Sequence, residues 1–70
     1  MLQETSKEEA DREYRNFHTM ASWNAFLTKE QVNYLFKERG DSLFCNGHVR
    51  ILKADLLTND TFKVYTIAMP

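Results

Sequence analysis

The sequence DSLFCNGHVRILKADLLTNDTFKVYTIAMP, residues 41–70, holds three segments rich in β-branched and aromatic residues. Asn46 and Gly47 separate the first two segments, and both tolerate the positive φ that a two-residue type I′ hairpin requires. The polar residues 58–60 separate the second segment from the third and favour a looser turn. The stretch therefore predicts a three-stranded antiparallel meander over about residues 42–69.

Apolar side chains occur at both alternating sets of positions in this meander, so both of its faces are expected to be apolar. Two-residue turns would place Leu52 opposite Ile67. On that register, one face carries Phe44, Val49, Ile51, Phe62 and Val64. The other carries Leu43, Cys45, Leu52, Ala54, Leu56, Tyr65, Ile67 and Met69, and we assign it to the helices. A β-bulge near residues 53–55 is the alternative, because it would shift the register by one residue and leave one face wet.

Two helices are expected before the meander. Ala10, Tyr14 and Phe17 recur at spacings of four and three, which predicts an amphipathic helix over about residues 6–21 in an acidic N-terminal segment. Charged residues of the opposite sign at i,i+4 favour a solvated outer face for this helix.

The second helix has clearer boundaries. Thr28 and Gln31 match the spacing of a capping box, and Gly40 suits the position just after a helix end. They predict a helix over residues 29–39. Trp23 and Phe26 do not share the apolar stripe of the first helix, so we expect the chain to turn between the two helices.

The expected fold is therefore a single α+β domain over residues 1–70, with two N-terminal helices packed on a three-stranded meander in the order α-α-β-β-β. A chain of this size buries a modest share of its surface, and such domains gain stability from disulfides, metals or oligomers. The only cysteine is Cys45, so no intrachain disulfide can form, and an unpaired thiol favours a reducing compartment. Neither a secretory signal nor a membrane span is predicted, so we expect a cytoplasmic protein.

Few residues suggest catalysis or metal binding. Cys45 and His48 flank the predicted hairpin turn, and a thiol beside an imidazole can act as a nucleophile or as half of a zinc site. A tight turn is not expected to form a pocket, however, and the only other histidine is His18. The sequence predicts no enzyme activity, cofactor or metal.

The leading hypothesis is a non-catalytic protein–protein interaction module, of the adaptor or inhibitor kind. Its 5 Phe, 3 Tyr and 1 Trp supply side chains of the type that anchor protein interfaces. The partner is expected to be another protein or a second copy of the chain. The predicted partner-binding residues are Trp23, Phe26, Phe44, Val49, Ile51, Phe62 and Val64.

An alternative hypothesis is a DNA-binding regulator of the winged helix-turn-helix type, with helix 29–39 as the recognition helix. The residues that could reach bases or phosphates are Lys29, Gln31, Asn33, Lys37 and Arg39. Two features count against it. The formal net charge is −1, whereas phosphate-backbone binders rely on an excess of Lys and Arg, and the predicted wing strands are apolar.

Overall fold

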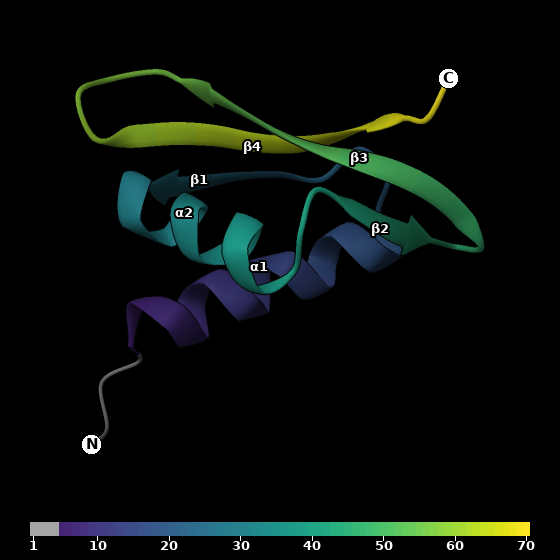
Figure 1. Ribbon diagram of the computed structural model, residues 1–70, viewed down its shortest axis with the longest axis horizontal. Helices are drawn as coiled ribbons and strands as arrows, with labels where there is room; N and C mark the ends of the chain where they lie inside the picture. Colours follow the sequence, from purple (N-terminus) through teal and green to yellow (C-terminus); the bar gives the residue numbers. More distant parts are fainter. Residues whose placement is uncertain (1–4) are drawn as a thin grey trace.

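The computed structural model describes residues 5–70 of the chain, so the start of the predicted acidic segment and domain lies outside the described residues. Two helices cover one face of a four-stranded antiparallel sheet, and the other face is open (Figure 1). The sheet order is β1-β4-β3-β2. The elements are α1 (Ser6–Thr19), β1 (Asn24–Thr28), α2 (Lys29–Glu38), β2 (Ser42–Cys45), β3 (His48–Leu56) and β4 (Thr61–Ala68). The predicted α+β class is confirmed.

The predicted order α-α-β-β-β is wrong in detail, because a fourth strand, β1, lies between the two helices. Ala25 and Leu27 are buried while Phe26 is exposed, which is the alternation of a strand with one face on the core. β1 pairs with β4, and Ala25 lies opposite Val64. β1 has only five residues, and its partner β4 lies far along the chain. Its alternation of buried and exposed residues is therefore too short to distinguish a strand from a turn in the sequence.

Helix α1 forms as the periodicity predicts. Ala10, Tyr14 and Phe17 are its buried residues, and Thr5 is the N-cap, accepting a hydrogen bond at 3.1 Å from the backbone N–H of Glu8. The helix ends close to the predicted boundary.

Helix α2 also begins as predicted. The side chain of Thr28 accepts from the Gln31 N–H, and the Gln31 side chain accepts from the Thr28 N–H, so the capping box is confirmed. The chain leaves the helix at Gly40, whose φ of 80° favours glycine.

The hairpin of β2 and β3 is confirmed in both turn and register. Asn46 and Gly47 have φ values of 52° and 85°, as a type I′ turn requires. Cys45 lies opposite His48, and Phe44 opposite Val49.

The predicted register of β3 and β4 is wrong by one residue. Leu52 lies opposite Thr66 and not Ile67, and the pairing runs without a bulge from Arg50 to Leu56. The connection between the strands has an odd number of residues, whereas the prediction assumed an even turn. A shift of one residue moves every side chain of β4 to the other face. Val64 therefore points to the helices, and Ile67 lies on the open face.

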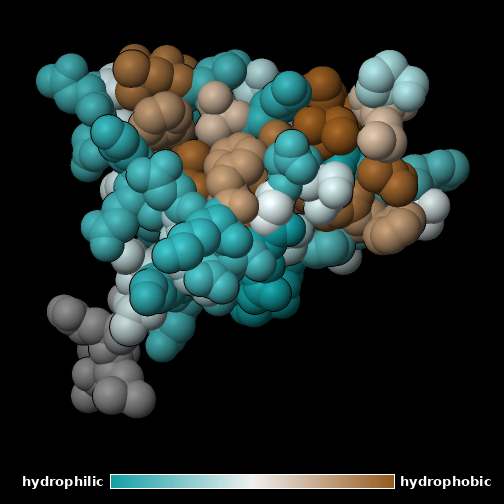
Figure 2. Space-filling view, in the orientation of Figure 1, coloured by the Kyte–Doolittle hydropathy of each residue, from teal (hydrophilic) through white to brown (hydrophobic). Residues whose placement is uncertain are grey.

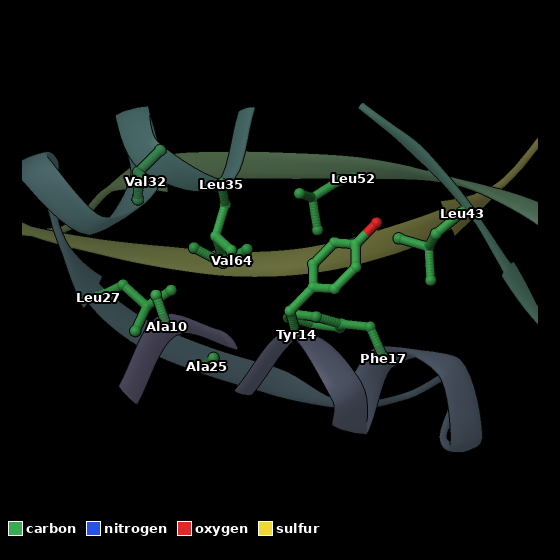
Figure 3. Close-up of a cluster of buried hydrophobic side chains, with 10 residues drawn as sticks. All are labelled: Ala10, Tyr14, Phe17, Ala25, Leu27, Val32, Leu35, Leu43, Leu52 and Val64. Carbon is green, nitrogen blue, oxygen red and sulfur yellow. The ribbon is translucent and has the colours of Figure 1, made fainter. Parts of the chain in front are cut away.

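The core lies between the helices and the sheet; α1, β1 and α2 each contribute two or more of its residues, and β2, β3 and β4 contribute one each (Figure 3). Phe17, Leu35, Leu52 and Val64 are its largest fully buried side chains. No buried side-chain polar atom among residues 5–70 lacks a hydrogen-bond partner. The helix face of the sheet is thus closed, and the opposite face is open.

Candidate protein-binding surface

The open face of the sheet carries large apolar side chains that no element of the described chain covers. Phe26 is 62% exposed, Phe44 63% and Ile67 40%. Val49 and Ile51 lie between them and are half-buried. Figure 2 shows hydrophobic atoms gathered over the sheet side of the molecule, and hydrophilic atoms over the helices below it.

The apolar side chains gather toward one end of the open face. Phe44 pairs with Val49 across β2 and β3, and Ile51 pairs with Ile67 across β3 and β4. Facing pairs on a sheet lie within contact distance of one another. These four residues, which we call the apolar end, form a continuous surface from the β2 edge to the middle of the sheet.

The other end of the same face is polar and internally bonded. The Tyr65 hydroxyl donates to Asp55 Oδ2 at 2.8 Å, and Lys63 Nζ lies 5.7 Å from the centre of the Tyr65 ring. The hydrogen bond to Asp55 is the main cause that raises the pKa of Tyr65 above its usual 10.0. This end holds charges in place on the sheet surface instead of presenting apolar area.

The predicted binding residues divide between the two sides of the sheet. Phe26 lies on the open face together with Phe44, Val49 and Ile51. Val64 is 1% exposed, and Phe62 packs against the core from the same side, as the corrected register requires. Trp23 also packs against the core. Ile67 and Tyr65 were missed on the open face, and only the number of residues in the β3–β4 turn could have placed them there.

A groove of about 330 Å³ follows the outer edge of β1 on the helix side of the sheet. Glu9 and Glu13 of α1 line one wall, and β1 with Trp23 lines the other. Both carboxylates are held in place: Glu13 Oε1 accepts from Trp23 Nε1 at 3.1 Å, and Glu9 Oε1 accepts from Gln31 Nε2 at 2.7 Å. The sequence analysis did not predict this groove, because it depends on β1.

Cys45 and His48 face each other across the hairpin, as expected, and contribute to a hollow of about 520 Å³ beside the end of β4. The prediction that this turn forms no pocket is therefore wrong. Cys45 is buried, at 3% exposure, and within residues 5–70 no side-chain hydrogen bond joins its thiol to His48. Nearby, Arg50 is bonded to both Thr66 Oγ1 and the Thr66 carbonyl. The described residues contain no group of three or more side chains suited to hold a metal.

Only some of the residues predicted to bind DNA are exposed and available on α2. Lys29, Asn33 and Lys37 are exposed on α2. Gln31 is buried in its capping box, and Arg39 pairs with Asp11 at 3.3 Å and lies over the Tyr14 ring. The element before α2 is a strand, so the described chain has no helix-turn-helix there.

None of the helices described in residues 5–70 is long and apolar enough to cross a membrane. Comparisons with protein-family models, with curated proteins and with solved structures each found no match.

Proposed function

We propose that this chain is a non-catalytic protein-interaction module, of the adaptor or inhibitor kind, that binds protein through the open face of its sheet. The single observation that carries the proposal is the exposure of Phe44 and Ile67 beside Val49 and Ile51, with nothing in the described chain to cover them. Exposed aromatic side chains within an apolar patch often anchor protein interfaces.

The partner that suits this face most simply is a second copy of the chain. Two sheets can pack face to face, and a two-fold axis through the apolar end would bring the same four residues of each copy together. Lys63 and Asp55 would then lie at the rim of the interface, where charged groups can stay in water. A chain of 70 residues also gains stability from such an interface. A buried free Cys45 is consistent with the cytoplasm as the compartment.

Placing a charge at the apolar end tests the proposal. Phe44→Lys/Ile67→Lys changes two exposed side chains, so the fold should survive while association is lost. Leu56→Lys/Leu57→Lys is the matched control, because these residues are as exposed but lie at the β3–β4 connection. Far-UV circular dichroism and thermal melting verify that both variants fold. The proposal is wrong if both double variants associate to the same degree as the unchanged protein.

A further inference from the structure

We infer that the outer edge of β1, with the acidic groove beside it, binds an extended segment of another protein whose basic side chains alternate with apolar ones. The segment would pair with β1 as a fifth strand of the sheet. This inference concerns a different surface from the apolar end and does not depend on self-association.

The two edges of the sheet differ in how their backbone is protected. At the β2 edge, His18 Nδ1 lies 2.7 Å from the carbonyl oxygen of Phe44, and the Asn46 side chain donates to the Thr19 carbonyl, so α1 covers that edge. At the β1 edge, the residues Asn24–Thr28 include no charged side chain and no proline, the usual means of preventing further strand pairing.

The hydrogen-bond pattern identifies which groups of β1 are open. Leu57 N–H donates to the Thr61 carbonyl at 2.9 Å, so odd-numbered residues of β4 bond toward β3 and even-numbered ones toward β1. Ala25 and Leu27, opposite Val64 and Phe62, are therefore the residues of β1 that bond to β4.

Asn24 and Phe26 must then direct their N–H and C=O groups outward. Thr28 is the next residue in this alternation, so its N–H should also point away from β4. It does, because it donates to the Gln31 side chain. Within the described part of the chain, no hydrogen bond occupies the backbone groups of Asn24 or Phe26. These outward groups form the ladder that an added strand would complete.

The chemistry of the groove specifies the side chains of the added strand. Glu9 and Glu13 are one helical turn apart, about 6 Å along α1, and alternate residues of a strand are about 6.6 Å apart. Two basic side chains at positions i and i+2 therefore match the two carboxylates. The hydrogen-bond donors to the two Oε1 atoms, Trp23 and Gln31, are neutral groups. The intervening side chains would emerge beside exposed Phe26 on the open face, which favours apolar residues there.

A second copy of the chain fits this edge poorly. Antiparallel pairing of two β1 strands in one continuous sheet would place both α1 helices on the same face, with their acidic groove walls toward each other. Like charges across such an interface oppose association. A basic strand from another protein would instead be attracted to the acidic wall of the groove.

The test uses a short capped peptide in which lysine and valine alternate, titrated into the isotopically labelled protein. So small a contact should bind weakly, at about millimolar concentration, which suits NMR. We expect hydrogen exchange of the Phe26 amide to slow on binding, while the amides of Ala25 and Leu27, already bonded to β4, change little. Glu9→Gln/Glu13→Gln should weaken binding about threefold to tenfold, because each substitution keeps an acceptor oxygen but removes a charge.

Three controls separate backbone pairing from charge. Glu30→Gln/Glu38→Gln removes two acids from α2 outside the groove and should leave affinity unchanged. A peptide with glutamate in place of lysine, and a peptide N-methylated at the pairing positions, should both fail to bind. Equal binding to the Glu9→Gln/Glu13→Gln variant, equal binding of the N-methylated peptide, or no change at the Phe26 amide up to about 5 mM peptide would overturn the inference. Slowed Phe26 exchange in the concentrated protein alone would assign the edge to a second copy and also overturn it.

Discussion

Single side chains in this protein connect elements that the sequence separates. Gln31 is the clearest case, because its side chain accepts from the Thr28 N–H and donates to both the Ser6 carbonyl and Glu9. It is 4% exposed, so the three bonds replace water that cannot reach it. One amide thus fixes the start of α2 against α1.

Gln31→Ala should destabilise the fold by about 1–3 kcal/mol, because it leaves buried polar groups without partners. Asn33→Ala, an exposed change on the same helix, should alter stability by less than about 0.5 kcal/mol. Urea unfolding followed by circular dichroism measures both. Equal stability of the two variants would show that the Gln31 contacts contribute nothing.

Tyr65 and Asp55 give a prediction about pH. The carboxylate that accepts from the phenol raises the pKa of Tyr65, so the folded chain holds this proton more tightly than the unfolded chain. This contribution to stability is fully present below the unfolded pKa of about 10 and is lost as pH rises through the folded pKa. Asp55→Ala should lower the Tyr65 pKa toward 10.0, measured by NMR titration of the tyrosine ring carbons. Asp60→Ala, in the loop after β3, is the control, and an unchanged Tyr65 pKa in Asp55→Ala would contradict the assignment.

At the scale of elements, the sequence predicted best where the determining residues are close together. The capping box of α2, the apolar stripe of α1 and the Asn46-Gly47 turn are each complete within one or two helical turns or one hairpin, and each is confirmed. The strand β1 and the register of β4 depend on pairing between distant segments. Because Val64 and Ile67 are both apolar, the pattern of β4 alone could not identify the side that faces the core.

The corrected register makes a prediction about β4. Val64→Ala should destabilise the fold by about 2 kcal/mol, since Val64 is buried in the core. Ile67→Ala removes more carbon atoms, yet it should cost the single chain less than about 1 kcal/mol because the side chain is exposed there. The comparison is made at a protein concentration low enough for the chain to be monomeric. Urea unfolding of the two variants gives the comparison. If Ile67→Ala destabilised the fold more than Val64→Ala, the register expected from two-residue turns would be the correct one.

The dependence on pairing between distant segments also limited the prediction of the candidate binding surface. Phe44, Val49 and Ile51 were placed together correctly from the hairpin, whose turn has a recognisable sequence. On β4, Ile67 lies on the open face, where Phe62 and Val64 were expected. The one-residue shift in register exchanges the β4 side chains that face the helices with those that face away from them. The acidic groove could not be predicted from the sequence, because one of its walls is β1, which the sequence analysis does not predict as a strand.

At the scale of the whole molecule, the helices cover one face of the sheet and leave the other face open (Figure 1). The apolar end and the β1 edge are separate surfaces, so the proposed self-association and the proposed strand pairing can be disrupted independently. Variants of Phe44 and Ile67 should leave peptide binding at β1 intact, and variants of Glu9 and Glu13 should leave self-association intact.

The most direct test of the proposed function is the solution mass of the unchanged protein, measured by light scattering on a size-exclusion column over a range of concentrations. The account predicts a mass twice that of the 8.3 kDa chain at high concentration, and a return to the mass of one chain in Phe44→Lys/Ile67→Lys. Leu56→Lys/Leu57→Lys should remain a dimer. A mass of one chain at every concentration would contradict the account.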